Sequence, residues 1–158
     1  MIRPMHPTEI PTCVALIRES FATVAREFAI TPENAPRFTA FATTEDRLTW
    51  QFQQGRPMFV FIEGEEIGGY YSLEIKGAAC ELNNLCTHPA FRHRKIGGQL
   101  LAFAFAEANR RGCSRMEIGI VEENLRLRRW YEAHGFRHIG TKQFDFFPFT
   151  CGYLEREV

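Results

Sequence analysis

The stretch from Pro89 to Leu101, "PAFRHRKIGGQLL", places a basic loop between two regular elements. A β-rich run precedes the loop and a long apolar run follows it, so the sequence predicts a strand, a loop and a helix in this order. Free backbone N–H groups at a helix N-terminus bind anions, and glycine lets a phosphate approach the backbone closely. The loop and helix start carry Arg92, His93, Arg94, Lys95, Ile96, Gly97 and Gly98. We interpret them as a phosphate-binding loop, with a solvated basic loop as the alternative.

The 158 residues have no net charge, because 19 Lys and Arg balance 19 Asp and Glu. Such a chain has no global field that attracts nucleic acid or an anionic membrane, so we expect neither partner. No apolar run approaches the roughly 18 residues of a membrane span, and the N-terminus lacks the apolar core of a signal peptide. Five scattered cysteines suit a reducing compartment. These features favour a cytoplasmic protein.

A metal site is not expected from the histidines and cysteines. His134 and His138 have the four-residue spacing of a helical metal site. Gly135 lies between them and is typical of a helix end, which would separate the two imidazoles. The cysteines form no CxxC pair.

Periodicity and turn residues predict a single mixed domain over residues 1–158. The expected helices cover 8–28, 44–55, 96–112 and 124–135, and the expected strands cover 2–5, 115–121, 136–141 and 149–157. Residues 57–89 contain two turn signals between β-rich runs and predict a meander of three antiparallel strands. Residues 29–44 predict an irregular connection. This order describes an α/β fold, a mixed sheet with helices on its faces.

The strand, the basic loop, the long helix and the later "NLRLRRWYEAHGF" together resemble the Gcn5-related N-acetyltransferase (GNAT) superfamily. The family loop reads Q/R-x-x-G-x-G/A, where Arg92 matches the first position, Gly97 matches the last, and Lys95 replaces the middle glycine. The resemblance implies a mostly antiparallel sheet of six to seven strands with helices on both faces. It also implies that the backbone from Arg92 to Gly98 holds the pyrophosphate of acetyl-coenzyme A. A left-handed backbone at Lys95 would cost about 1 kcal/mol relative to glycine.

The resemblance also implies roles for residues near the reacting thioester. Tyr131 would be the general acid that protonates the departing thiolate, with a buried core aromatic as the alternative. Asn124 is first a helix N-cap, and in the family it also contacts the pantetheine arm. The family's strand at Leu85, Cys86 and Thr87 pairs with pantetheine through its backbone. The Cys86 thiol itself fits core packing better than nucleophilic catalysis, because nothing near it in the sequence activates it.

Glu81 aligns with a glutamate that acts as the base in some relatives. A carboxylate in a cleft can have its pKa raised by desolvation, which suits proton acceptance directly or through water. An equal alternative is a strand glutamate that faces solvent or pairs with a neighbouring strand. Glu122 and Glu123 are further candidates at a strand end.

The acceptor side is predicted from the phenylalanines of the first helices and of "FDFFPF". An apolar pocket with one carboxylate, such as Asp145, would suit a small amine with an apolar body. Core packing or a homodimer interface is the alternative for these rings. The sequence thus predicts an acetyl-coenzyme A-dependent N-acetyltransferase that acts on a small primary amine in a ternary complex. A non-catalytic acyl-coenzyme A-binding module remains the rival.

Overall fold

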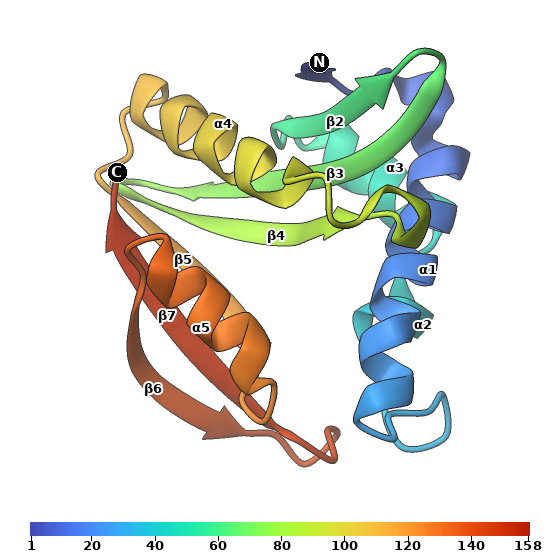
Figure 1. Ribbon diagram of the computed structural model, residues 1–158, viewed down its shortest axis with the longest axis vertical. Coiled ribbons are helices and arrows are strands. Elements are labelled where there is room, and N and C mark those ends of the chain that lie inside the picture. The colour runs from blue at the N-terminus through green and yellow to red at the C-terminus, as the bar shows by residue number, and fades with distance from the viewer.

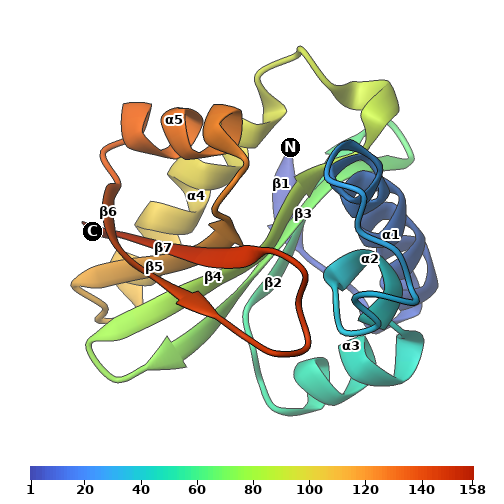
Figure 2. The same ribbon diagram turned by 90° about the horizontal axis from the view of Figure 1, so that it is seen from below.

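The computed structural model describes residues 1–158 and contains one seven-stranded sheet with helices on both of its faces (Figures 1 and 2). The strands are β1 (Ile2–Pro4), β2 (Met58–Glu63), β3 (Glu66–Lys76), β4 (Ala79–Thr87), β5 (Arg115–Val121), β6 (Arg137–Gln143) and β7 (Thr150–Glu157). The helices are α1 (Ile10–Glu27), α2 (Thr39–Ala42), α3 (Glu45–Gln53), α4 (Ile96–Arg110) and α5 (Leu125–Ala133), with 3₁₀ turns η1 (Pro7–Glu9) and η2 (Pro89–Phe91).

The sheet has the order β1-β2-β3-β4-β5-β7-β6, and only β4 and β5 are parallel. Their ladder is short and ends at the pair Glu81 and Glu117. Beyond that pair the two strands diverge into a V (Figure 1). A diverging strand leaves backbone N–H and C=O groups along one edge without a strand partner. The V is therefore the one place inside the sheet where a ligand can pair with a central strand.

Alternating side chains of the central strands point to two separate cores, as a period of two residues dictates. Phe59 and Tyr71 pack into the core beneath α4 and α5. Val60 and Tyr70 pack into a second core beneath α1 and α3. Each fully buried aliphatic or aromatic side chain contributes about 1.5–3 kcal/mol from burial. The two cores hold α1 on one face of the sheet and α4 with α5 on the other (Figure 2).

The predicted order of elements is confirmed from the first strand to the last. The predicted mixed, mostly antiparallel sheet with helices on both faces is confirmed as well. Two segments differ in detail. The 3₁₀ turn η1 takes up the first residues of the expected first helix, so α1 begins at Ile10, and the short helix α2 lies in the expected irregular connection. No helix is both long and apolar enough to cross a membrane.

Candidate active site

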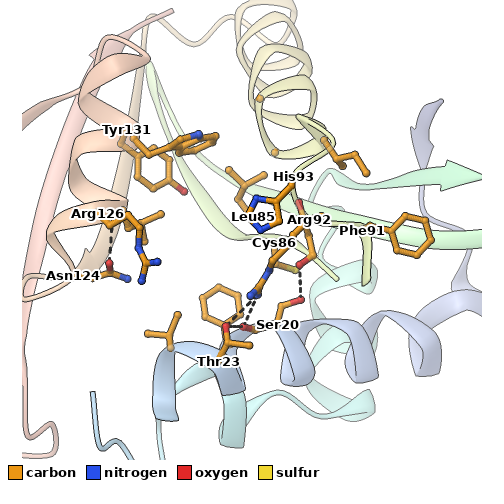
Figure 3. Close-up of a pocket in the computed structure, with 18 of the residues that line it drawn as sticks. Ser20, Thr23, Leu85, Cys86, Phe91, Arg92, His93, Asn124, Arg126 and Tyr131 are labelled. Atoms are coloured by element: carbon orange, nitrogen blue, oxygen red, sulfur yellow. Dashed lines mark hydrogen bonds between the residues drawn. The ribbon is translucent and has the colours of Figure 1, made fainter. Parts of the chain in front are cut away.

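Two adjoining cavities lie where β4 and β5 diverge. The first has a volume of about 630 Å³ and is lined by α1, the end of β4, the basic loop and α5 (Figure 3). The second has a volume of about 270 Å³ and is lined by α1, β4, β5, α5, β7, residues 37–39, Phe147 and Phe149. Six residues line both cavities: Phe21, Val24, Leu85, Asn124, Leu127 and Tyr131. The two cavities therefore meet over Leu85 on one side and Tyr131 on the other.

The basic loop presents a row of unpaired backbone donors to the first cavity. None of the six backbone N–H groups from His93 to Gly98 has a hydrogen-bond partner within the protein. The loop residues that line this cavity are Arg92, His93, Lys95, Ile96, Gly97 and Gly98. Free N–H groups at a helix N-terminus and nearby cations form an anion site. The loop therefore offers an anion in this cavity several unpaired backbone donors.

Lys95 caps α4 with a left-handed backbone, at φ 60° and ψ 23°. His93 is also left-handed, at φ 66°. Such conformations are unfavourable for residues with a Cβ atom, and they cost of order 1 kcal/mol each. The loop therefore has a left-handed backbone at the position where the family motif has its middle glycine, although this chain has Lys95 there.

Side-chain contacts anchor the loop on both flanks. The Arg92 guanidinium donates to the Ser20 carbonyl at 3.2 Å and to Thr23 Oγ1 at 3.1 Å, which ties the loop to α1 (Figure 3). Arg94 turns away from the cavity and pairs with Glu63 at 2.8 Å. Of the seven residues predicted from Arg92 to Gly98, Arg94 alone does not line the cavity.

Gly69 on β3 lets the start of α4 approach the sheet. A Cβ atom at this position would lie 2.7 Å from Leu100 Cδ1 and 3.3 Å from the Cys86 carbonyl oxygen. Both contacts are too close for an additional methyl group. The loop position therefore depends on a glycine in the neighbouring strand.

Leu85, Cys86 and Thr87 form the end of β4 and line the first cavity. A bulge interrupts the β3–β4 register there, and Asn84 has a left-handed backbone at φ 56°. Cys86 is buried, and burial raises the pKa of its thiol from 9.0 to about 12. A thiol with this pKa is protonated at neutral pH and is a poor nucleophile. The Cys86 side chain therefore packs in the core beneath α1 and α3.

Tyr131 on α5 is buried except for its hydroxyl end, which points toward β4 (Figure 3). The hydroxyl makes no hydrogen bond within the protein, yet it is not sealed from solvent as those of Tyr70 and Tyr71 are. Burial raises the pKa of this phenol well above its ordinary value of 10, and the nearby Cys86 adds to the effect. The phenol is therefore protonated over the physiological pH range, which is the state that a proton donor needs.

Asn124 caps α5, because its Oδ1 accepts a hydrogen bond from the Leu127 N–H at 3.2 Å. The residue is buried and lines both cavities. Its Nδ2 has no partner within the protein, so the amide group can cap the helix and still donate to a ligand.

Glu81 lines neither cavity. Its carboxylate accepts a hydrogen bond from Lys76 Nζ at 2.7 Å, and it stands opposite Glu74 and Glu117 across the sheet. Glu81 is near Tyr153, and Tyr153 lines the second cavity. The pKa of Tyr153 is raised by burial, by Cys151 and by the negative charge of Glu81. Glu81 thus lies just below the V.

The two other predicted acids have structural partners. Glu122 accepts hydrogen bonds from Arg128 at 3.1 Å and from His138 at 2.8 Å. Glu123 accepts a hydrogen bond from the Thr150 N–H at 3.2 Å. Neither residue lines a cavity.

The second cavity is apolar, and 14 of its 19 lining residues are hydrophobic. Phe147 and Phe149 stack at 4.7 Å between ring centroids and form one wall. The prediction of a carboxylate in this cavity is wrong. Asp145 is exposed outside the cavity, and no acidic residue lines the cavity. Its one charged residue is Arg37, on the connection between α1 and α2.

Comparison with known proteins assigns the family. The sequence profile described as "Acetyltransferase (GNAT) family" matches residues 23–136, which is more than half of the chain. The chain belongs to the GNAT acetyltransferase family. A relative with 25% identity, over 86% of this chain and 83% of its own length, is the uncharacterized N-acetyltransferase in the pepI 3′ region of Lactobacillus delbrueckii subsp. lactis.

Solved GNAT structures share the complete fold. The PaiA N-acetyltransferase from Thermoplasma acidophilum, solved with coenzyme A, has a TM-score of 0.85 and 18% identity, covering 100% of this chain and 98% of that one. The ribosomal-protein-S18-alanine N-acetyltransferase from Escherichia coli has a TM-score of 0.80 and 12% identity, covering 100% and 93%. These neighbours confirm the predicted GNAT fold, and the family confirms the prediction of an acetyltransferase enzyme.

Helix α1 supplies a wall of this acetyltransferase site that the sequence reasoning missed. Five of its residues line the first cavity: Ser20, Phe21, Thr23, Val24 and Glu27. Helix periodicity places Ser20, Thr23 and Glu27 on one face, where polar residues interrupt an otherwise apolar pattern. That interruption was the available signal. It was ambiguous, because a polar position in an amphipathic helix more often faces solvent.

The two histidines at a metal-like spacing lie in separate environments in this GNAT enzyme. His134 ends α5 and its Nδ1 lies 2.8 Å from the Trp130 carbonyl oxygen, whereas His138 on β6 pairs with Glu122. The structure contains no group of three or more His, Cys, Asp or Glu side chains placed to hold a metal ion.

Proposed function

We propose that this enzyme transfers an acetyl group from acetyl-coenzyme A to the primary amine of a small molecule, by direct attack in a ternary complex. One observation carries the proposal. A larger cavity with unpaired backbone donors meets a smaller apolar cavity, and the hydroxyl of Tyr131 lies at their junction. Two substrates bound in these cavities would meet at one proton donor.

The residues of the first cavity suit a coenzyme A ester. The unpaired N–H groups from His93 to Gly98 would hold the pyrophosphate, and the Lys95 ammonium would add charge. The unpaired edge of β4 from Leu85 to Thr87 would pair with the pantetheine amides, to which the free Nδ2 of Asn124 would also donate. When bound, acetyl-coenzyme A supplies an activated thioester carbonyl.

The chemistry requires two proton movements. The neutral amine nitrogen forms a bond to the thioester carbonyl carbon, and the carbon–sulfur bond breaks. Tyr131 gives its proton to the departing sulfur, and the nitrogen loses a proton. We assign that second proton to Glu81, through solvent at the Tyr153 end of the second cavity. The buried Cys86 thiol supports direct attack over a covalent enzyme intermediate.

The second cavity supports a small acceptor. Its volume of about 270 Å³ lies just below the usual range of small-molecule sites, about 300–1,000 Å³, which suits only a small acceptor. Its aromatic walls favour an apolar body. The five free cysteines, four of them buried, also support action in a reducing compartment such as the cytoplasm.

Thermal shift and thiol release test the proposal together. Acetyl-coenzyme A at 100 times its dissociation constant is expected to stabilise the protein by about 2.7 kcal/mol, a shift of several degrees. ATP at the same concentration is the control for phosphate binding alone. Release of coenzyme A thiol is then followed with a panel of small primary amines. A selective shift without thiol release from any amine would contradict the proposed transfer.

A further inference from the structure

Arg37 gives the second cavity its only formal charge. The other polar groups that line it are neutral, and no Asp, Glu, Lys or His is among the lining residues. A neutral amine needs no counter-ion there, but most amines enter an enzyme from water as cations. An apolar cavity with a guanidinium and no carboxylate repels such a cation. A simple alkylamine is therefore a poor fit to this cavity.

The Arg37 guanidinium is available to an anion. The side chain is exposed and forms no ion pair, since none of the protein's salt bridges includes it. Its guanidinium carbon lies 4.3 Å from the ring centroid of Phe146, which holds the planar group against an aromatic face. Arginine binds carboxylates through two parallel hydrogen bonds, and a stacked guanidinium keeps its edges free for them.

One uncharged polar residue of the second cavity is Asn84. Its side chain makes no hydrogen bond within the protein, and its left-handed backbone at φ 56° lies at the bulge beside Leu85. Strained backbone positions of this kind concentrate at functional sites. Asn84 and Arg37 both line the second cavity alone, but Asn84 directly precedes Leu85, which lines both cavities. From this neighbour we place Asn84 toward the junction of the cavities and Arg37 toward the remote end.

We propose that the acceptor is an apolar amino acid, whose carboxylate pairs with Arg37 and whose amine lies beside Asn84 at the junction with the first cavity. This inference rests on the acetyl transfer proposed above and names its substrate class. The carboxylate offsets the charge of Arg37, which removes the repulsion that a simple alkylamine meets. The rings of Phe38, Phe147 and Phe149 surround the apolar side chain.

Three acceptors of matched shape test the inference: L-phenylalanine, L-phenylalaninamide and 2-phenylethylamine. The amide keeps the bulk and has the least basic amine of the three, so it separates the effect of the carboxylate from the effect of basicity. Thiol release from acetyl-coenzyme A gives kcat/KM for each acceptor. We expect L-phenylalanine to exceed both others by roughly tenfold or more, as for one charge-assisted hydrogen-bonded pair.

Variants at Arg37 locate the effect. Arg37→Gln is expected to lower kcat/KM for L-phenylalanine roughly tenfold. The same variant should raise kcat/KM for 2-phenylethylamine and L-phenylalaninamide, because it removes the repulsion between Arg37 and their ammonium groups. Arg37→Lys keeps the charge and is expected to restore part of the preference. Arg47→Gln is the matched control, because Arg47 is an exposed residue on α3 that lines neither cavity. Thermal unfolding of each variant reports whether it is folded.

The outcomes separate the two proposals. Transfer to 2-phenylethylamine that equals or exceeds transfer to L-phenylalanine would overturn the amino-acid inference and leave acetyl transfer intact. An equal loss for all three acceptors in Arg37→Gln would overturn the role of Arg37. Binding of acetyl-coenzyme A without thiol release from any acceptor would contradict the transfer itself and the inference with it.

Discussion

Glu27 on α1 and Arg126 on α5 join the two helices that flank the first cavity. Arg126 Nη2 donates to both carboxylate oxygens of Glu27, at 2.8 and 2.9 Å. The residues lie 99 positions apart in the chain, and both line the cavity. Their side chains are 80% and 46% exposed for Arg126 and Glu27, so the pair adds at most about 1 kcal/mol to stability. We expect the Glu27–Arg126 pair to affect the binding of acetyl-coenzyme A more than stability.

Removing the charge of Glu27 and removing the charge of Arg126 are expected to change the affinity for acetyl-coenzyme A in opposite directions. Coenzyme A is anionic, so Glu27→Gln should strengthen binding of acetyl-coenzyme A about two- to fivefold, and Arg126→Gln should weaken it by a similar factor. Both effects should shrink in high salt, because exposed charges are screened. Isothermal titration at low and high salt measures them. A loss in both variants would show instead that the pair itself shapes the cavity.

Tyr131→Phe is expected to lower kcat by about 10²-fold or more, because the departing thiolate loses its proton donor. The dissociation constant of acetyl-coenzyme A should change little, since the ring stays in place. Tyr71→Phe is the matched control: its hydroxyl is buried without a partner, and turnover should be unaffected. Single-turnover kinetics and titration separate the two quantities. Equal turnover of Tyr131→Phe and the native enzyme would exclude the acid role.

The element order could be predicted because each segment has a strong local signal. The alternation of β2 and β3 residues between two cores, the glycines after α4 and α5, and the turns of the meander all act over a few residues. The divergence of β4 from β5 has no such local signal. It depends on which strands pair across the whole chain, so only the family resemblance indicated it.

The basic loop and the strand end of the first cavity could be predicted to lie together because each is a continuous stretch of sequence, whereas the α1 wall of the same cavity was missed. The second cavity is built from segments distant in sequence, such as residues 37–39 and the pair Phe147 and Phe149. The sequence predicts that Asp145 supplies the charge of the acceptor cavity, because it lies among phenylalanines in the chain. In the fold Asp145 is exposed outside this cavity, and the charged residue that lines it is Arg37. Sequence proximity to apolar residues does not tell which side of a loop faces a cavity.

Lys95→Gly is expected to stabilise the protein by up to about 1 kcal/mol, because glycine adopts the left-handed backbone without steric cost. Lys95→Ala keeps the strain and removes the charge, so it should not stabilise. Both variants should weaken coenzyme A binding more than dephospho-coenzyme A binding if the ammonium contacts the additional phosphate. Thermal unfolding and titration with both ligands measure this. Equal losses for the two ligands would exclude that contact.

Glu81→Gln is expected to lower kcat about tenfold or more if Glu81 receives the amine proton, with the largest effect where the acceptor is mostly protonated. Glu74→Gln is the matched control, because Glu74 lies opposite Glu81 on β3 and has its own ion-pair partner, Arg56. The pH dependence of kcat/KM is measured for both. Identical profiles would assign Glu81 to its ion pair with Lys76 alone.

Cys86→Ala is expected to retain acetyl transfer, because the native thiol is protonated and takes no part in direct attack.

The raised pKa of the Cys86 thiol also makes the free energy of unfolding depend on pH. The unfolded thiol ionises above about pH 9, while the folded thiol stays protonated to about pH 12. The unfolded state therefore binds fewer protons in this window, and stability falls as pH rises through it. Urea unfolding across this pH window should show a shallower decline for Cys86→Ala than for the native protein. An unchanged slope would mean that Cys86 ionises equally in both states.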